Sequence, residues 1–343
     1  MGSTMHDVAR LASVSIKTVS NVINDHPHVR PDTRDRVLVA IEELGYRPNL
    51  SARGLRSGRT GVIGLAVPAL RENYFAELAD AIIRAADARG LGVVVEQTSG
   101  DRERELQVVS GGRLRLTDGL LFSPSALGQS DAGSLSTEFP LVLLGERIFD
   151  GPTDHVAMHN TTSARAAVEH LLDTGRRRIA IIGAEEERGV EVSSASLRLD
   201  GYLLALECAG IDIDQQLIRA SSHWNHSTGA STVRQLIDEA VEFDAVFALN
   251  DTLALGALRA LGEADLRVPE DVAVIGFDNI DEAQYSLPSL SSVDVGSEQI
   301  AATAVDLLIE RIAEKGARRP PRTVKPDFRI VRRESTGFPG ARR

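Results

Sequence analysis

The first 60 residues place apolar side chains three or four positions apart, which is the spacing of one face of an α-helix. A first helix is predicted over about 5–12, where Thr4 and Asp7 have the spacing of a capping box. A second helix is predicted over 16–23, after the capping residue Ser15. The inward faces of these two helices are expected to consist of Val8, Leu11, Ala12, Val19, Val22 and Ile23.

A third helix follows a turn-rich stretch. It is predicted to begin at Pro31, which suits a first helical turn, and to stop at Gly45. Its apolar residues repeat at i, i+4 and i+7, namely Val37, Ile41 and Leu44. Because helices this short are marginal alone, residues 1–47 are predicted to fold together, followed by a linker over 48–59.

From Gly61 onward, apolar strand-like runs alternate with amphipathic helices. The predicted strands are Val62–Val67, Val93–Glu96, Leu120–Phe122, Leu141–Leu144, Ile179–Ile182, Ala245–Leu249 and Val272–Phe277. The predicted helices between them include Phe75–Arg89, Leu199–Ala209 and Thr252–Leu261. This alternation is typical of doubly wound parallel α/β sheets, and the chain is long enough for two such lobes.

The composition is that of an ordinary globular protein, with 43% hydrophobic and 25% charged residues. The single cysteine, Cys208, cannot form an internal disulfide, which favours a reducing compartment. The first residues lack the apolar segment of a signal peptide, and no apolar run approaches the roughly 18 residues of a membrane span. We therefore expect a cytoplasmic protein with no membrane partner.

The charge distribution separates the two parts of the chain. A net charge of −11 argues against a polyanionic partner, since phosphate contacts need Lys and Arg. The first 60 residues, however, carry nine basic and six acidic side chains, a net of +3, which leaves −14 for the rest. This asymmetry favours an N-terminal nucleic-acid-binding module on an acidic body.

The second predicted helix has an outward face suited to a DNA major groove. An outward Ile16 beside Lys17 and Asn21 is unusual for a surface that meets only solvent. Lys17 can donate to guanine, Asn21 can pair with base edges, and Ile16 can contact a thymine methyl group. Ser15 and Thr18 can bind phosphate. From the spacing alone, a small packing domain with a polar face remains the alternative.

Several blocks of sequence resemble LacI/GalR-type transcriptional regulators. The headpiece and hinge of that family are matched by MHDVARLASVSIKTVSNVIN and VRPDTRDRVLVAIEELGYRPNLSARGLRSGRTGVIGL. The similarity continues through RRRIAIIG, LRLDGY, FALNDTLALGAL and VPEDVAVIGFDNI, nearly to the end of the chain. It implies a helix-turn-helix headpiece, a hinge helix and a periplasmic-binding-protein-like α/β body. It implies DNA contacts at Thr4, Ser15, Ile16, Lys17, Thr18, Asn21, Asn24, His28, Asn49, Ala52 and Leu55.

The segment from Pro48 to Arg56 matches the hinge helix of this family. Asn49 is a candidate N-cap, and Ala52 and Leu55 lie three residues apart on one face. The resemblance implies that the segment folds on operator DNA as one of a dimer-related pair. It also implies that Leu55 enters the minor groove as an apolar wedge.

The resemblance divides residues 60–334 into two lobes that enclose an effector. The first lobe is expected to comprise roughly 60–160 and 292–322, and the second 161–291 and 323–334, with 335–343 as a tail. Ligands of such folds bind at the carboxyl ends of the strands. The expected effector-binding residues are Tyr74, Phe75, Ser123, Arg198, Trp224, Asn250 and Asp278.

Each of these effector residues also has a plainer interpretation. Arg198 opens a predicted helix and can bind vicinal hydroxyls or a carboxylate, but alone it could be a surface arginine. Trp224 can stack on a sugar ring, and its match to an aromatic position of the family's cleft favours this over a core role. Asn250 and Asp278 follow predicted strands, whereas Asp251 is expected to cap the next helix.

Enzyme and metal sites are not expected. The sequence contains no Walker A, GxSxG, HExxH or paired CxxC motif. His155 and His159 are spaced i, i+4, but apolar residues alternate with them as in a strand and no third ligand is near. We therefore predict no catalytic residues, no cofactor and no metal. A sugar-binding receptor would share the body but would need a signal peptide and no headpiece.

Together these features predict a ligand-responsive repressor of carbohydrate-related genes that binds a palindromic operator as a homodimer. The expected effector is a mono- or disaccharide, with a nucleoside as the alternative. Only about ten residues follow Arg333 and they show no heptad pattern, so a dimer is expected rather than a tetramer.

Overall fold

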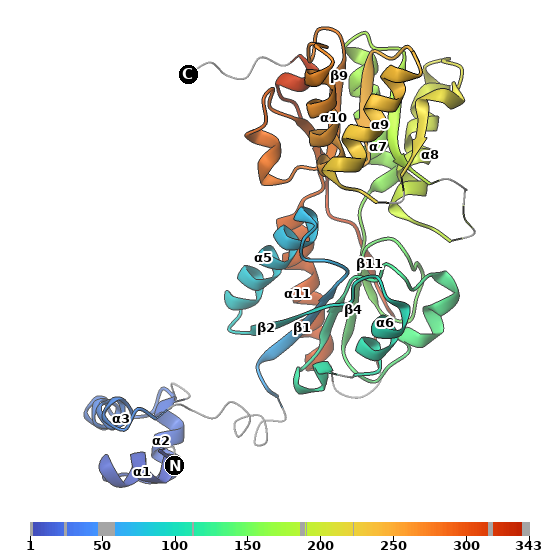
Figure 1. Ribbon diagram of the computed structural model, residues 1–343. Coiled ribbons are helices and arrows are strands. Elements are labelled where there is room, and N and C mark those ends of the chain that lie inside the picture. Colours follow the sequence, from blue (N-terminus) through green and yellow to red (C-terminus); the bar gives the residue numbers. More distant parts are fainter. Residues whose placement is uncertain are drawn as a thin grey trace. The chain divides into compact units, whose positions relative to one another are not determined.

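The computed structural model describes residues 3–23, 26–46, 59–111, 113–185, 189, 191–221, 223–314 and 318–337. The chain divides into two compact units, Met1–Gly61 and Val62–Arg343 (Figure 1). In the described part of the chain, no helix has both the length and the apolar character that crossing a membrane requires.

The N-terminal unit, here called the headpiece, consists of three helices. These are α1 (Met5–Leu11), α2 (Ile16–Ile23) and α3 (Pro31–Glu43), which confirms the three predicted helices to within two residues at each end. Thr4 caps α1 in a capping box with Asp7, as predicted. The buried core of the headpiece comprises Val8, Ala9, Ala12, Val19, Val22, Val37, Ala40 and Tyr46.

The predicted inward position of Leu11 is wrong. Its side chain is 45% exposed, whereas Val8, Ala9 and Ala12 are buried. The buried face of α1 is centred on those three residues, and Leu11 lies about 100° around the helix from that centre. The i, i+3 spacing from Val8 predicted that Leu11 belongs to the buried face. In the structure Leu11 lies at the border of that face instead.

The second unit, here called the body, contains two six-stranded sheets (Figure 1). In the first sheet the order is β11-β5-β4-β3-β1-β2, and all pairings among the described residues are parallel. Its strands are β1 (Val62–Val67), β2 (Gly92–Gln97), β3 (Leu120–Phe122), β4 (Leu141–Leu144), β5 (Asp154–Val156) and β11 (Thr323–Val324). The helices of this first lobe are α5 (Asn73–Asp87), α6 (Arg102–Val109) and α11 (Ser297–Ala313).

The second sheet has the order β12-β10-β9-β8-β6-β7, and only the β10/β12 pairing in the described chain is antiparallel. Its strands are β6 (Ile179–Ala184), β7 (Ile218–Ala220), β8 (Ala245–Ala248), β9 (Ala273–Asp278), β10 (Ser291–Asp294) and β12 (Arg329–Val331). The helices of this second lobe are α7 (Asn160–Asp173), α8 (Ser194–Cys208), α9 (His226–Asp238) and α10 (Asp251–Glu263). Short 3-10 helices complete the body: η1 (Arg113–Leu116), η2 (Gln129–Leu135), η3 (Gln215–Leu217), η4 (Asp281–Gln284) and η5 (Glu334–Thr336).

The chain crosses between the sheets later than predicted. Residues from 292 were assigned to the first lobe, but β10 still pairs with β9 in the second sheet through Asp294. Residues from 323 were assigned to the second lobe, but β11 pairs with β5 in the first sheet. Both strands are short and contain Ser, Thr or Asp, so neither forms the apolar run by which a buried strand is recognised.

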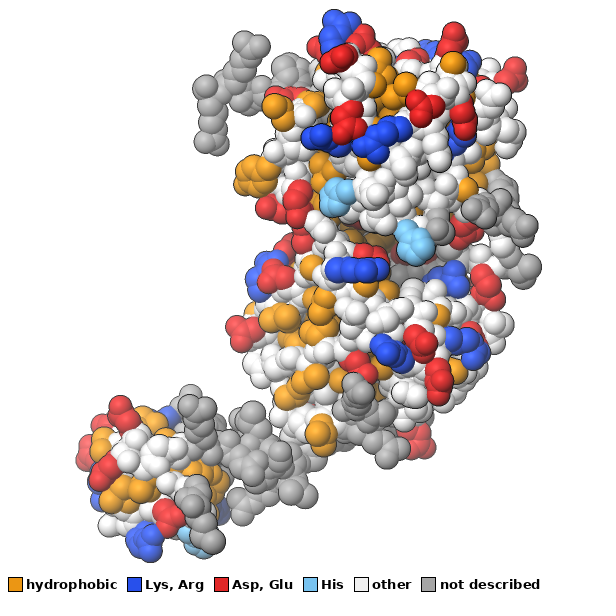
Figure 2. Space-filling view, in the orientation of Figure 1, with side chains coloured by type: hydrophobic (Ala, Val, Ile, Leu, Met, Phe, Trp, Pro, Cys, Tyr) orange, Lys and Arg blue, Asp and Glu red, His pale blue; other side chains and the backbone are white. Residues whose placement is uncertain are grey.

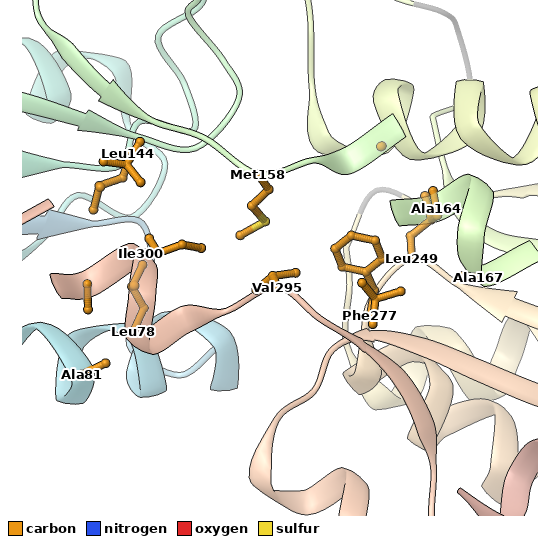
Figure 3. Packing of buried hydrophobic residues seen from close by; sticks show 14 of the residues in the cluster. Leu78, Ala81, Leu144, Met158, Ala164, Ala167, Leu249, Phe277, Val295 and Ile300 are labelled. Atoms are coloured by element: carbon orange, nitrogen blue, oxygen red, sulfur yellow. The ribbon is translucent and has the colours of Figure 1, made fainter. Parts of the chain in front are cut away.

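The crossing segments carry buried apolar side chains that join the cores of the two lobes. Met158 follows β5 and Val295 follows β10, and their side chains are 7% and 3% exposed. Figure 3 shows both residues between the packed side chains of the first lobe, such as Leu144, and those of the second, such as Phe277. The lobes therefore share one continuous hydrophobic cluster that passes through the crossings.

Two glycines let α9 and α10 pack at backbone distance. A Cβ at Gly256 would lie 2.1 Å from the carbonyl oxygen of His226, and a Cβ at Gly229 would lie 2.1 Å from that of Leu253. No larger residue fits at either position without moving a helix. The close contact holds α9 and α10 together beside β8 and β9, the strands that end at the candidate site.

A buried ion cluster ties α11 to the edge of the first sheet. Asp154 of β5 is fully buried and accepts two hydrogen bonds from Arg311, at 2.8 and 2.7 Å. It also accepts the backbone N–H of Arg322 at 2.8 Å. Burial opposes the charged carboxylate, but these hydrogen bonds outweigh it and lower the pKa of Asp154.

Candidate functional site

In the headpiece, α2 carries the residues predicted to read DNA. The Lys17 side chain is exposed and the Asn21 side chain is partly exposed. Ser15 Oγ accepts the backbone N–H of Thr18 at 3.1 Å and lies 2.9 Å from Thr18 Oγ1. The capping role of Ser15 is thereby confirmed, while a phosphate contact by the two hydroxyls stays a prediction.

Ile16 does not face outward as predicted. Its side chain is partly buried and packs against the headpiece core. The reason is that Ile16 lies three residues before Val19 and seven before Ile23, so all three share one face of α2. A thymine contact by Ile16 would need part of this packing to give way.

The other predicted DNA contacts have mixed positions. Thr4 uses its hydroxyl in the capping box, where it donates to Asp7 Oδ2 at 2.6 Å. His28 is exposed between α2 and α3, with its ring centroid 5.6 Å from that of His26. The remaining predicted contacts, Asn24, Asn49, Ala52 and Leu55, lie outside the described residues.

In the body, Arg198 is the centre of a buried polar cluster. Its side chain is 3% exposed. Its Nε donates to Asn160 Oδ1 at 2.7 Å, and one terminal nitrogen donates to the carbonyl oxygen of Leu249. The guanidinium carbon lies 3.5 Å from the ring centroid of Phe277, and a terminal nitrogen lies 3.7 Å from a carboxylate oxygen of Asp278. Arg198 is therefore held from every side by the protein rather than extended toward solvent.

The position of Arg198 in its helix differs from the prediction. Arg198 was expected to open a helix, but α8 begins at Ser194, where Ser193 caps the N-terminus. In this turn the backbone N–H of Ser193 donates to Ser196 Oγ, and the backbone N–H of Ser196 donates to Ser193 Oγ. A Ser-rich helix start of this kind carries no apolar periodicity, so the sequence pattern located the helix too late.

Asp278 ends β9 and points its carboxylate at Arg198 without a hydrogen bond. Its side chain is 7% exposed and its backbone has a φ of 102°. Among the hydrogen bonds of the described residues, none ends on this carboxylate. Burial raises the pKa of Asp278 to about 7, against the opposing effect of Arg198, and carboxylates including Glu146 and Glu77 raise it further.

The first lobe carries three of the predicted effector-binding residues, Tyr74, Phe75 and Ser123. Tyr74 and Phe75 occupy the first turn of α5, with their rings edge to face at a centroid distance of 5.1 Å. Burial, followed by the charges of Glu146 and Asp278, raises the pKa of Tyr74 well above its usual range. Tyr74 therefore lies within electrostatic reach of a carboxylate from each lobe. Ser123 follows β3 directly and is buried, so it lies at the carboxyl edge of the first sheet.

Asn250, rather than Asp251 as predicted, caps the helix that follows β8. Asn250 caps α10, because its Oδ1 accepts the backbone N–H of Leu253 at 2.8 Å. Asp251 is the first residue of α10, is fully buried, and accepts from Ser292 Oγ at 2.6 Å and from the N–H of Ile280 at 2.9 Å. The prediction that Asp251 is the cap is wrong by one residue, since the strand ends one position earlier than expected.

Trp224 lies at the border between the core and the candidate site. Its indole N–H donates to the carbonyl oxygen of Gly183 at 2.9 Å, near the end of β6. The Arg198 guanidinium carbon lies 5.4 Å from the indole ring. The ring packs against the core but remains partly exposed. It is thus fixed in orientation with its polar atom already paired.

Sequence reasoning missed Glu146 and Asn160. Glu146 follows β4 by two residues and is buried, with Oε1 accepting the N–H of Met158 and Oε2 accepting the hydroxyl of Ser194, each at 2.9 Å. Asn160 is 2% exposed, and its Nδ2 has no hydrogen-bond acceptor. The position of Glu146 after a buried strand was the available signal.

Polar contacts bridge the lobes around this cluster. Asn73 Nδ2 donates to Glu282 at 2.6 Å, and the N–H of Asp281 donates to Glu77 at 2.7 Å. Figure 2 shows the surface of the body drawn in at the level where the lobes meet. The cavities beside α6, α10 and α11 are lined by none of the predicted effector residues. The cluster therefore lies beside direct polar contacts between the two lobes.

Substituting Asp278 should reveal its raised pKa. Because the pKa is about 7 in the folded chain against an ordinary value of 3.8, folding retains a proton that the unfolded chain releases. The stability present at low pH is therefore lost as the pH rises through about 4 to 7. Asp278→Asn removes this titration, so its free energy of unfolding relative to wild type should rise over the same range. Denaturant titrations at several pH values measure this difference, with exposed Asp212→Asn as the control. A difference that does not vary with pH would contradict the assignment.

Two family models match this sequence, one at its N-terminus and one in its C-terminal half. Residues 4–49 match the family model described as bacterial regulatory proteins of the lacI family, and residues 168–336 match a periplasmic binding protein-like domain. The ribose operon repressor of Escherichia coli (strain K12) is 33% identical over 314 residues, covering 91% of this chain and 94% of its own.

Solved structures agree with these matches. A putative transcriptional regulator of the LacI family from Sanguibacter keddieii DSM 10542 is 48% identical, with a TM-score of 0.76, over 82% of this chain and 100% of its own. The lac repressor dimer bound to operator and the anti-inducer ONPF is 28% identical, with a TM-score of 0.80, over 98% of this chain and 99% of its own. With a headpiece, a two-lobed body and relatives that span nearly the whole sequence, the chain belongs to the lacI family of bacterial regulatory proteins and is a DNA-binding transcriptional regulator.

Proposed function

We propose that this protein is a homodimeric repressor that reads a palindromic operator through α2 and binds a small sugar-like ligand between the lobes of its body. Each protomer reads one half of the operator. Ligand and operator binding are coupled, so each changes the affinity for the other by the same factor. Its role is regulatory, without catalysis.

The observation that carries the ligand site is the convergence of both lobes on Arg198 and Asp278. Arg198 and Asp278 come from α8 and β9 of the second lobe. Tyr74 and Glu146 come from the first lobe, and their charges act on Asp278 or are acted on by it. A site built from two lobes joined by crossing segments can respond to a ligand by changing the angle between them.

The chemistry of this cluster suits a hydroxylated ring. Asp278 offers a buried carboxylate with no protein donor, and Asn160 offers a buried amide N–H with no acceptor. Because buried polar groups are normally hydrogen-bonded, both favour a ligand that supplies hydroxyl groups. Trp224 is partly exposed with its N–H paired, which leaves the apolar ring for contact. The name of the ribose operon repressor, a relative over nearly the whole chain, supports the same class.

Exposed apolar side chains of the second lobe support a homodimer. Leu287 is 94% exposed and Tyr285 is 77% exposed, directly after η4. Leu255 and Leu258 of α10 line a cavity of about 500 Å³ together with Leu287. Large apolar side chains gathered in this way are typical of a protein interface.

The ligand site can be tested through Trp224, which is the only tryptophan in the chain. The full chain is titrated with a panel of mono- and disaccharides, with nucleosides as the competing class, while Trp224 emission and thermal unfolding are followed. We expect one saccharide to change the emission and to raise the unfolding temperature, because a ligand stabilises the state that binds it.

Two variants decide whether the active compound binds at the proposed site. Asp278→Asn and Trp224→Phe should each remove the thermal shift, while Asp212→Asn, on the exposed surface, should keep it. A shift that persists in both site variants would place the ligand elsewhere. A response to a nucleoside alone would show that the effector class is wrong.

A further inference from the structure

Asn160 brings an unpaired hydrogen-bond donor into the cluster around Arg198. It is the first residue of α7 and follows Met158 of the crossing segment by two positions. It is 2% exposed, and its Nδ2 has no acceptor among the described residues. A buried donor without an acceptor is costly and rare in folded proteins. The acceptor for Nδ2 is therefore expected to come from outside the chain.

Arg198 fixes which end of the Asn160 amide is left unpaired. Arg198 Nε can only donate, and it lies 2.7 Å from Asn160 Oδ1. A rotated amide would set two donors against each other, so Oδ1 stays on the arginine and Nδ2 is free to donate. The two polar atoms of an amide are about 2.2 Å apart, which keeps Nδ2 within about 5 Å of Arg198 Nε.

Arg198 also joins Asn160 to the carboxyl ends of three strands. It donates to the carbonyl oxygen of Leu249, directly after β8, and lies 3.7 Å from Asp278, the last residue of β9. Met158, two residues after β5, places its sulfur 3.8 Å from a terminal nitrogen of Arg198. Ligands of parallel α/β sheets bind at such strand ends. The free donor of Asn160 therefore belongs to the candidate site.

A second donor beside Asn160 also lacks a strong acceptor. Arg198 Nη2 faces the sulfur of Met158, and a thioether sulfur is a weak acceptor. Its 3.7 Å separation from Asp278 Oδ1 exceeds that of a normal hydrogen bond. In the fixed fork of a guanidinium group, Nη2 lies on the same edge as the Nε–H that holds Asn160. This edge of the cluster is thus supplied with donors and short of acceptors.

We propose that Asn160 is a specificity-determining residue that donates through Nδ2 to a hydroxyl oxygen of the bound saccharide. This inference rests on the proposed function, because it assigns one contact of the same site and the direction of its hydrogen bond. A ligand with a methylene group at that position leaves the amide unpaired, and sites built to hydrogen-bond a hydroxyl group reject analogues that lack it.

Asn160→Asp separates the donor from the rest of the side chain. Aspartate has the same shape and still accepts from Arg198 Nε, but when ionised it has no N–H to donate. The full chain is titrated calorimetrically with ribose, glucose, galactose and mannose. A sugar that binds wild type should bind Asn160→Asp at least about tenfold more weakly. Gln235→Glu, at an exposed position of α9, makes the same amide-to-carboxylate change and should keep the affinity.

Monodeoxy forms of the same sugars identify the oxygen that Asn160 contacts. One of them should bind wild type at least about tenfold more weakly than its parent, because the amide then loses its acceptor. The same deoxy sugar and its parent should bind Asn160→Asp equally, since the donor is already absent. Asn160→Ala, which adds no charge, should show the same loss for the parent and the same indifference to the deoxy form.

The outcomes separate this inference from the proposed function. A sugar that binds both Asn160 variants as tightly as wild type would overturn the assignment of Asn160 and leave a saccharide site in place, with a buried water as the partner of Nδ2. A deoxy sugar whose loss of affinity is the same in wild type and in the variants would also overturn it. If none of the four sugars binds wild type, both the Asn160 contact and the saccharide site are wrong.

Discussion

Replacing Arg198 by alanine is expected to destabilise the body by about 3–5 kcal/mol and to abolish ligand binding, because removing one partner of a buried ion pair leaves the other charge unpaired. Asp278 would lose the guanidinium that lies 3.7 Å from its carboxylate, Phe277 the group stacked on it, and Asn160 and Leu249 their donor.

Denaturant unfolding and ligand titration measure the two effects of Arg198→Ala separately. Arg165→Ala is the matched control, since Arg165 forms an exposed i, i+4 pair with Glu169 on α7 and its loss should leave the free energy of unfolding almost unchanged. Arg198→Lys keeps the charge but cannot reproduce the planar contacts, so it should fall between the two. An Arg198→Ala protein that unfolds like wild type and binds the same ligand would refute the central role of this residue.

Replacing Lys17 and Asn21 by alanine is expected to reduce operator affinity strongly while random DNA is bound almost as before. Both side chains lie on α2 away from the headpiece core. A good base contact discriminates by about 1–3 kcal/mol, so each substitution should cost roughly tenfold or more. Loss of Lys17 should also reduce the salt dependence of binding, because fewer counterions are released.

The matched control for Lys17→Ala is Lys325→Ala, which removes the same charge from the body. Fluorescence anisotropy on operator and random duplexes at several salt concentrations measures both effects. Equal losses on the two duplexes would assign Lys17 and Asn21 to backbone contacts alone. No loss on the operator would remove α2 from the interface.

The local features of the fold follow from the sequence, because they depend on neighbouring residues. The bounds of α2 come from Ser15 as a cap and from apolar positions three and four residues apart. The strand β1 is a continuous apolar run and has the predicted ends. In contrast, β10 contains Ser291 and Ser292, and its pairing with β9 depends on tertiary structure. Short strands of this composition are recognisable only when the sheet that receives them is known.

The sequence predicted which residues belong to the candidate site, but it did not predict which side chains contact one another there. Arg198 and Asp278 were identified, but the partners that hold Arg198 are 38 and 51 residues away at Asn160 and Leu249. Glu146 was missed because a lone carboxylate after a strand matches no motif. Its significance comes from contact with Ser194 across the lobes.

The measurement that tests the account most directly is operator binding by the full chain and by a chain that lacks residues 1–58. Each is titrated onto a labelled duplex from the region upstream of its own gene, in the presence of excess unlabelled random DNA. We predict that the full chain binds this duplex specifically, with an affinity that falls as salt rises, and that the shortened chain does not bind. Specific binding that survives the deletion, or a full chain that does not distinguish the duplex from random DNA, would contradict the assignment of this protein as an operator-reading regulator.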